Sequence, residues 1–65
     1  MYATIWVDNG MKLKVGMSRE EFDQLLEAWE MGNKDQVTGF RVAYEIVYVA
    51  HSHIAAMTYA MKVSL

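Results

Sequence analysis

Residues 18–31 restrict the fold most, because they specify where one helix begins, which face it buries and where it ends. Ser18 and Glu21 have the Ser-x-x-Glu spacing of a capping box, which satisfies backbone donors at a helix start. The apolar positions recur at helical spacing and form one stripe: Phe22, Leu25, Leu26 and Trp29. Gly32 and Asn33 follow at the C-cap, where we expect left-handed backbone.

The stretch before this helix is typical of a β-hairpin over residues 2–15. The letters YATIWV are β-branched, aromatic or small, and Asp-Asn-Gly then supplies residues that tolerate positive φ in a tight reversal. The letters MKLKV alternate between apolar residues and lysine. Such a strand covers a core on one face and meets water on the other.

The stretch after the helix predicts two further strands. Residues 37–49 alternate at first and then become fully apolar, which favours one strand buried on both faces. Because strands seldom exceed about 10 residues, we expect a reversal at the polar cluster His51-Ser52-His53, with the strand before it pairing with the strand after it. Residues 53–62 contain helix-forming Ala and Met, so a C-terminal helix remains an alternative. The prediction is one α+β domain over residues 1–65, of order ββαββ, with one helix packed across an antiparallel sheet.

Composition indicates how such a small domain is stabilised. A chain of 65 residues buries only about 60% of its unfolded surface. It has no cysteine, which excludes disulfides and thiolate zinc sites, yet 54% of it is hydrophobic, including six Met and four Tyr. We therefore expect another copy of the chain to cover part of the apolar surface; the alternative is a monomer with scattered apolar surface residues.

The chain also lacks the marks of export. The N-terminus has no basic start followed by an apolar core, as a signal peptide would. No uninterrupted apolar run reaches the roughly 18–20 residues of a membrane span. We expect a cytoplasmic protein without a membrane partner.

The segment VYVAHSHIAAM resembles a pattern in short, largely uncharacterised prokaryotic and phage proteins. In those proteins a strand ending in a Val-Tyr-Val-like triplet is followed by a short polar turn, His-Ile and a last strand. The likeness covers residues 37–59, and the family has Asn-Pro where this chain has Ala50 and His51. The resemblance implies a ββαββ fold and a phage or mobile-element origin, and it implies no activity.

The two histidines are the residues that most suggest a site. In an extended segment both rings would lie on one face, about 6–7 Å apart, but a zinc site needs three or four ligands and none is near except Glu45 and Asp35. We therefore interpret His51 and His53 as turn residues and predict no metal site and no cofactor. Ser52 lacks a Gly-x-Ser-x-Gly elbow, so we also expect that the chain is not an enzyme.

Three binding functions remain. The first is a self-associating protein-interaction module, such as a phage-type accessory or inhibitor protein, whose partner-binding residues are Glu20, Asp23 and Glu27 on an acidic helix face, together with Trp6. The second is a binder of a small anionic ligand between subunits, with a cleft lined by Arg41, Tyr44, Tyr48, His51 and His53.

The third is a weak binder of single-stranded nucleic acid through Lys12, Lys14 and Trp6. The net charge of −2 argues against a general nucleic-acid binder, for which a basic surface is expected.

Overall fold

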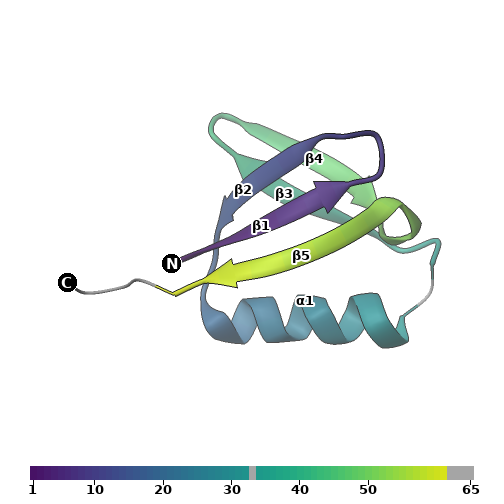
Figure 1. Ribbon diagram of the computed structural model, residues 1–65, viewed down its shortest axis with the longest axis horizontal. Helices are drawn as coiled ribbons and strands as arrows, with labels where there is room; N and C mark the ends of the chain where they lie inside the picture. Colours follow the sequence, from purple (N-terminus) through teal and green to yellow (C-terminus); the bar gives the residue numbers. More distant parts are fainter. Residues whose placement is uncertain (33, 62–65) are drawn as a thin grey trace.

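The computed structural model describes residues 1–32 and 34–61, and within them the chain forms an α+β fold of five strands and one α-helix (Figure 1). The elements in chain order are β1 (Tyr2–Val7), β2 (Lys12–Gly16), α1 (Arg19–Met31), β3 (Val37–Val42), β4 (Glu45–Ala50), a 3-10 turn η1 (His51–His53) and β5 (Ile54–Ala60). The strands make two antiparallel sheets, one of order β2-β1-β5 and one consisting of β3 and β4. The predicted α+β class and the order of two strands, helix and further strands are confirmed.

The first hairpin forms as predicted. Its strands pair from Tyr2 opposite Gly16 to Trp6 opposite Lys12. The reversal uses Gly10, whose φ of 92° is a conformation that residues with a Cβ rarely adopt. The side chain of Asn9 accepts a hydrogen bond from the backbone N–H of Met11 at 2.9 Å, so the turn satisfies its own backbone.

The helix is also confirmed, with both halves of the capping box present. Ser18 Oγ accepts from the Glu21 N–H at 3.1 Å, and the Glu21 carboxylate accepts from the Ser18 N–H at 2.9 Å. The expectation of a left-handed C-cap is wrong for Gly32, whose φ is −86°, while Asn33 lies outside the described residues. Glycine is required at position 32 because a Cβ there would overlap the carbonyl oxygen of Ala28.

The expected long strand over residues 37–49 is instead a tight hairpin. Ala43 and Tyr44 form its turn, and Ala43 has a φ of 56°, the one positive φ among the non-glycine residues described. β3 and β4 then pair from Val42 opposite Glu45 to Val37 opposite Ala50. The apolar run conceals this reversal because it contains no glycine, asparagine or proline at the turn.

The last strand is placed differently from the prediction as well. Residues 54–60 form a strand and not a helix, although residue 62 lies outside the described part of the chain. A turn does occur at His51–His53, but β5 pairs with β1 and not with the strand that precedes the turn. The turn therefore carries the chain from one sheet to the other, and the predicted single sheet becomes two.

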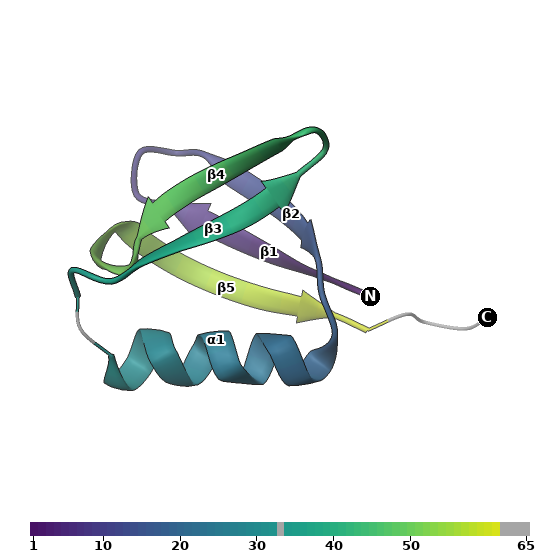
Figure 2. The ribbon, with the colours of Figure 1, turned by 180° about the vertical axis from the view of Figure 1, so that it is seen from behind.

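The core lies where the two sheets and the helix meet. The β3–β4 hairpin crosses one face of the three-stranded sheet, and α1 runs beside β5 (Figures 1 and 2). The fully buried apolar residues come from every α-helix and strand: Ala3, Ile5, Leu13, Val15, Phe22, Phe40, Val49 and Ile54. Tyr59 fixes the helix, because its ring packs 5.1 Å from that of Phe22 and its hydroxyl donates to the Met17 carbonyl.

Candidate protein-binding site

The β3–β4 hairpin leaves two strand edges without a strand neighbour within the described residues. The His51 N–H donates to the Gln36 carbonyl at 2.8 Å, which extends the hairpin's hydrogen-bond ladder by one pair. Hydrogen-bonded pairs alternate in an antiparallel ladder, so the even-numbered residues of β3 bond to β4. The backbone groups of Gly39 and Arg41 on β3, and of Ile46 and Tyr48 on β4, point away from the hairpin.

The outward face of this hairpin is apolar. Opposite Gly39 on the neighbouring strand is Tyr48, whose ring lies over the glycine so closely that a Cβ would approach it to 2.8 Å. The large apolar residues exposed on or beside this face are Val37 (53%), Tyr44 (105%), Ile46 (52%) and Tyr48 (70%). Of these residues, Ile46 and Tyr48 lie two positions apart on the same face of β4, and exposed neighbouring apolar side chains are typical of an interaction surface.

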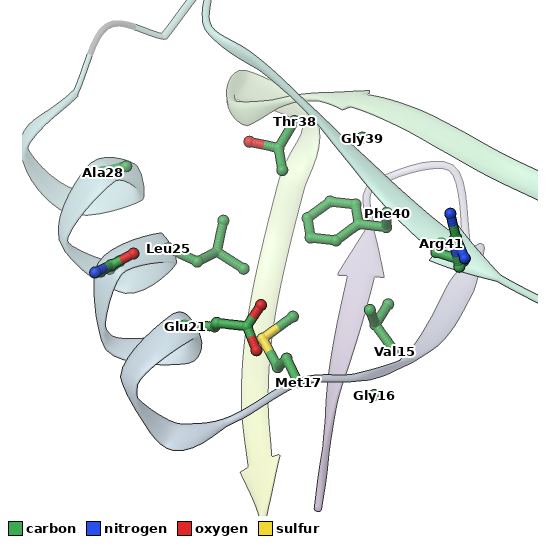
Figure 3. Close-up of a pocket in the computed structure, with 11 residues that line it drawn as sticks. Val15, Gly16, Met17, Glu21, Leu25, Ala28, Thr38, Gly39, Phe40 and Arg41 are labelled. Carbon is green, nitrogen blue, oxygen red and sulfur yellow. The ribbon is translucent and has the colours of Figure 1, made fainter.

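A groove lies between α1 and the open edge of β3, and we call it the helix groove (Figure 3). It has a volume of about 440 Å³. One wall is α1, with Glu21, Gln24, Leu25 and Ala28, and the other is Thr38–Arg41 of β3. Figure 3 shows Leu25, Phe40 and Met17 pointing into the space between the walls.

The helix wall of this groove is acidic. The hydrogen bonds from Ser18, first from its backbone, hold the pKa of Glu21 below its ordinary value of 4.5, so this carboxylate is ionised at neutral pH. Glu20 and Glu27 lie four residues before and three after Gln24, and are therefore its neighbours on the helix surface. Asp23 is paired with Arg19 at 3.0 Å on the exposed surface of the helix.

A second cavity, the turn cleft, lies between β4 and the β1–β2 turn and has a volume of about 340 Å³. His53 Nδ1 donates to Asp8 Oδ2 at 2.9 Å across its mouth, and the Asp8 N–H donates to the His53 carbonyl at 2.9 Å. Both side chains are more than half exposed. This pair ties the first turn to η1 and leaves Nε2 of His53 turned away from the carboxylate.

The side chain of His51 is buried and bonded within the fold. Its side chain is 1% exposed, and its Nε2 shares a hydrogen bond of 2.6 Å with Thr38 Oγ1. Nδ1 has no protein partner within the described residues. Thr38 also lines the helix groove, so this bond supports one wall of that groove from behind.

The structure does not bring the five predicted ligand-binding residues together in one chain. Arg41 and Tyr44 line a cavity of about 320 Å³ at the tip of the hairpin. Tyr48 and His53 line the turn cleft, which lies near the other end of the β3–β4 hairpin. His51 is buried beneath η1, so the prediction that it contacts a ligand is not supported by its position.

The predicted partner-binding residues occupy two surfaces. Glu20, Asp23 and Glu27 are exposed on α1, as expected. Trp6 is half-buried on the outer face of the three-stranded sheet, where Lys12 lies opposite it. This outer face also carries Tyr2, whose ring lies 4.6 Å from Nζ of Lys14, so the residues proposed for nucleic-acid contact do share one face.

No group of three or more His, Cys, Asp or Glu in the described residues is arranged to hold a metal ion. None of the helical residues described forms a stretch of the length and apolar character needed to span a bilayer.

Sequence reasoning missed the open edges and the groove. Gly39 and Phe40 line the groove because the chain reverses at Ala43, and no turn residue marks that reversal. A change of parity within an alternating run indicates a break in the strand. The reversal changes the parity of the buried positions, from even in β3 (Phe40) to odd in β4 (Val49), but residues 46–50 are all apolar, so the sequence does not show this change.

Comparison of the chain with protein-family models, with curated proteins and with solved structures gives no match.

Proposed function

We propose that this chain is a non-enzymatic, self-associating protein-binding module of the cytoplasm, and that its copies associate through the open edge of β4. The observation that carries the proposal is the character of that edge. β4 reads EIVYVA and contains no lysine, no proline and no bulge along its length. These are the features with which proteins usually block an exposed strand edge, so β4 is suited to pairing.

The pairing follows from the backbone groups that point outward. Ile46 and Tyr48 present free N–H and C=O groups along the edge of β4. Two copies related by a two-fold axis would place Ile46 of each chain opposite Tyr48 of the other, in an antiparallel ladder. The two hairpins would then form one four-stranded sheet, and the exposed side chains of Ile46 and Tyr48 would pack across the junction.

The absence of a catalytic function is supported by the turn cleft. Asp8 and His53 form a carboxylate–histidine pair in this cleft. No serine, threonine, cysteine or lysine is among the residues that line the cleft around them. A base oriented by a carboxylate needs a nucleophile or a reacting proton within hydrogen-bond reach. The one side-chain hydroxyl among the residues that line this cleft is the phenol of Tyr48, and no hydrogen bond joins it to His53 in the described residues.

The experiment is a measurement of molar mass in solution by light scattering over a range of concentrations. The wild-type chain is expected to form a dimer at micromolar concentration. Ile46→Lys places a charge in the edge strand and is expected to give a monomer, because it replaces the apolar contact of Ile46 with Tyr48 of the other copy and because lysine on an edge strand opposes pairing. Met31→Lys is the matched control, since it adds the same charge at an exposed apolar residue of α1, outside the hairpin, and should leave the dimer intact.

A wild-type chain that stays monomeric at high micromolar concentration contradicts the proposal. Equal loss of mass in the Ile46 and Met31 variants would also contradict it, because a general effect of charge would then explain the result. Circular dichroism of each variant separates loss of association from loss of folding.

The same pairing favours a second candidate function, the binding of a small anion between subunits. In the antiparallel register above, the hairpin tip of one copy, with Arg41 and Tyr44, lies beside η1 of the other copy. The partner's His53 then approaches the guanidinium of Arg41, although the two are at opposite ends of the hairpin within one chain. Inorganic phosphate should raise the melting temperature of the wild type but not of the monomeric Ile46→Lys variant.

A further inference from the structure

We propose that the helix groove binds an extended, basic segment of another protein, which adds as a new strand to the open edge of β3. This inference concerns the opposite edge of the hairpin from the self-association surface and does not depend on it. The recognition mode is strand addition in a groove between a sheet edge and a helix.

The backbone of β3 is accessible from the groove. Four consecutive residues, Thr38–Arg41, line it. Side chains alternate between the two faces of a strand, so four neighbours can line one cavity only if the cavity runs along the strand edge. Gly39 contributes backbone atoms alone, and its N–H and C=O point away from β4. The groove therefore offers unpaired backbone donors and acceptors, which an extended segment satisfies.

The floor of the groove is apolar. Val15 and Met17 come from the end of β2 and its link to α1, while Leu25 and Phe40 come from the two walls. Figure 3 shows these four side chains around the same space. Phe40 and Val15 are buried, and Leu25 and Met17 are half-buried. The partly exposed apolar atoms of Leu25 and Met17 can therefore contact an apolar side chain of the incoming strand.

The charges of the rim select a basic segment. Glu20, Glu21 and Glu27 line or border the helix wall, and the strand wall carries one base, Arg41. No ion pair joins Glu21 to Arg41. Three carboxylates against one guanidinium leave the rim negative, so lysine or arginine side chains directed toward α1 are favoured.

These features together define the partner. Alternate side chains of an extended segment point in opposite directions, so the segment should alternate apolar residues, which enter the floor, with basic residues, which lie along the helix rim. The occupant is a flexible or terminal segment, because its backbone must be free to pair with β3.

The test uses a capped hexapeptide of alternating valine and lysine, with a peptide of alternating valine and glutamate as the control. Binding is followed by amide hydrogen exchange in the full chain. We expect the valine–lysine peptide to slow exchange at Gly39 and Arg41, whose N–H groups face the groove. Exchange at Thr38 and Phe40 should change little, because these N–H groups already bond to β4. This odd–even pattern along β3 is the signature of strand addition.

Two variants with the same change of charge test the rim. Glu27 lies one helical turn after Gln24, which lines the groove, whereas Glu30 lies on the side of the helix opposite Glu21. The two variants are Glu27→Lys and Glu30→Lys. We expect Glu27→Lys to weaken the valine–lysine peptide about fivefold and Glu30→Lys to leave its affinity unchanged. Binding should persist in the Ile46→Lys variant, which keeps failure of this inference distinct from failure of self-association.

Three results would overturn the inference: no binding of the valine–lysine peptide at millimolar concentration, equal binding of the valine–glutamate peptide, or protection of Ile46 and Tyr48 in place of Gly39 and Arg41. The last result would assign the peptide to the edge of β4.

Discussion

Replacing Ala43 with glycine tests the reversal that creates both open edges. Ala43 has a φ of 56°, and a left-handed backbone costs a residue with a Cβ roughly 1–2 kcal/mol. Glycine removes this strain but loses more backbone entropy on folding, by roughly 0.5–1 kcal/mol relative to alanine. The difference predicts that Ala43→Gly raises the free energy of unfolding by about 0.5–1 kcal/mol.

Chemical denaturation followed by tryptophan fluorescence measures this change, and a thermal melt should show an increase of about 3–6 °C for a domain of this size. Ala56→Gly is the matched control, because Ala56 is an exposed residue of β5 that pairs with Trp6 and has no positive φ. Glycine within a strand lowers stability by roughly 0.5–1 kcal/mol, so the two substitutions should have opposite signs.

The sign of the Ala43 result decides between two architectures. In the single long strand that the sequence suggests over residues 37–49, Ala43 would be extended, and glycine would destabilise the chain as it is expected to do at Ala56. A loss of stability in Ala43→Gly would therefore refute the β3–β4 hairpin, and with it both proposed binding edges.

Three further predictions concern other parts of the chain. Thr38→Val should lower the free energy of unfolding by about 1–3 kcal/mol, as measured by denaturant titration, because the buried His51 ring then has no hydrogen-bond partner; Thr38→Ser, which keeps the hydroxyl, should lose less. The pKa of Glu21 is lowered from 4.5 in the folded chain. The ionised carboxylate therefore adds stability that is complete above pH 4.5 and is lost as the pH falls through the lowered pKa. Glu21→Gln should remove this loss of stability at acid pH, as measured by denaturation midpoints down to about pH 3. Two lysines, Lys12 and Lys14, limit the contacts of the outer sheet face with phosphates, so any binding of single-stranded oligonucleotides should show a log–log salt slope no steeper than about −1.4 in anisotropy titrations.

The elements that could be predicted from the sequence are those encoded by neighbouring residues. The helix has its cap, its apolar stripe and its terminal glycine within a short segment, and the first hairpin has Asp-Asn-Gly at its turn. These are local interactions, and they hold in the structure. The pairing of β5 with β1 joins Ala3 to Tyr59, far apart along the chain, and no local pattern specifies such a partner.

The candidate site was predicted less well, for a related reason. Its exposed acids, Glu20 and Glu27, follow from helical spacing. The groove itself requires Phe40 and Leu25 to face each other across two elements that are distant in sequence. It also requires the turn at Ala43, where alanine adopts the positive φ that glycine or asparagine usually adopts in a hairpin turn. An alanine at a turn position cannot be recognised from the residue type alone.

The two edges of the hairpin differ in a way that argues for two different partners. The edge of β4 is flat along its apolar outward face, bears no cation and is self-complementary, which suits a second copy of the same chain. The edge of β3 carries Arg41 and faces a helix wall that contains Glu21, with Glu20 and Glu27 beside it on α1, so two copies of this edge would bring like charges together. Strand addition at β3, as proposed, therefore calls for a partner of opposite charge, and the two proposals together predict that the hairpin binds a second copy and a foreign segment at the same time.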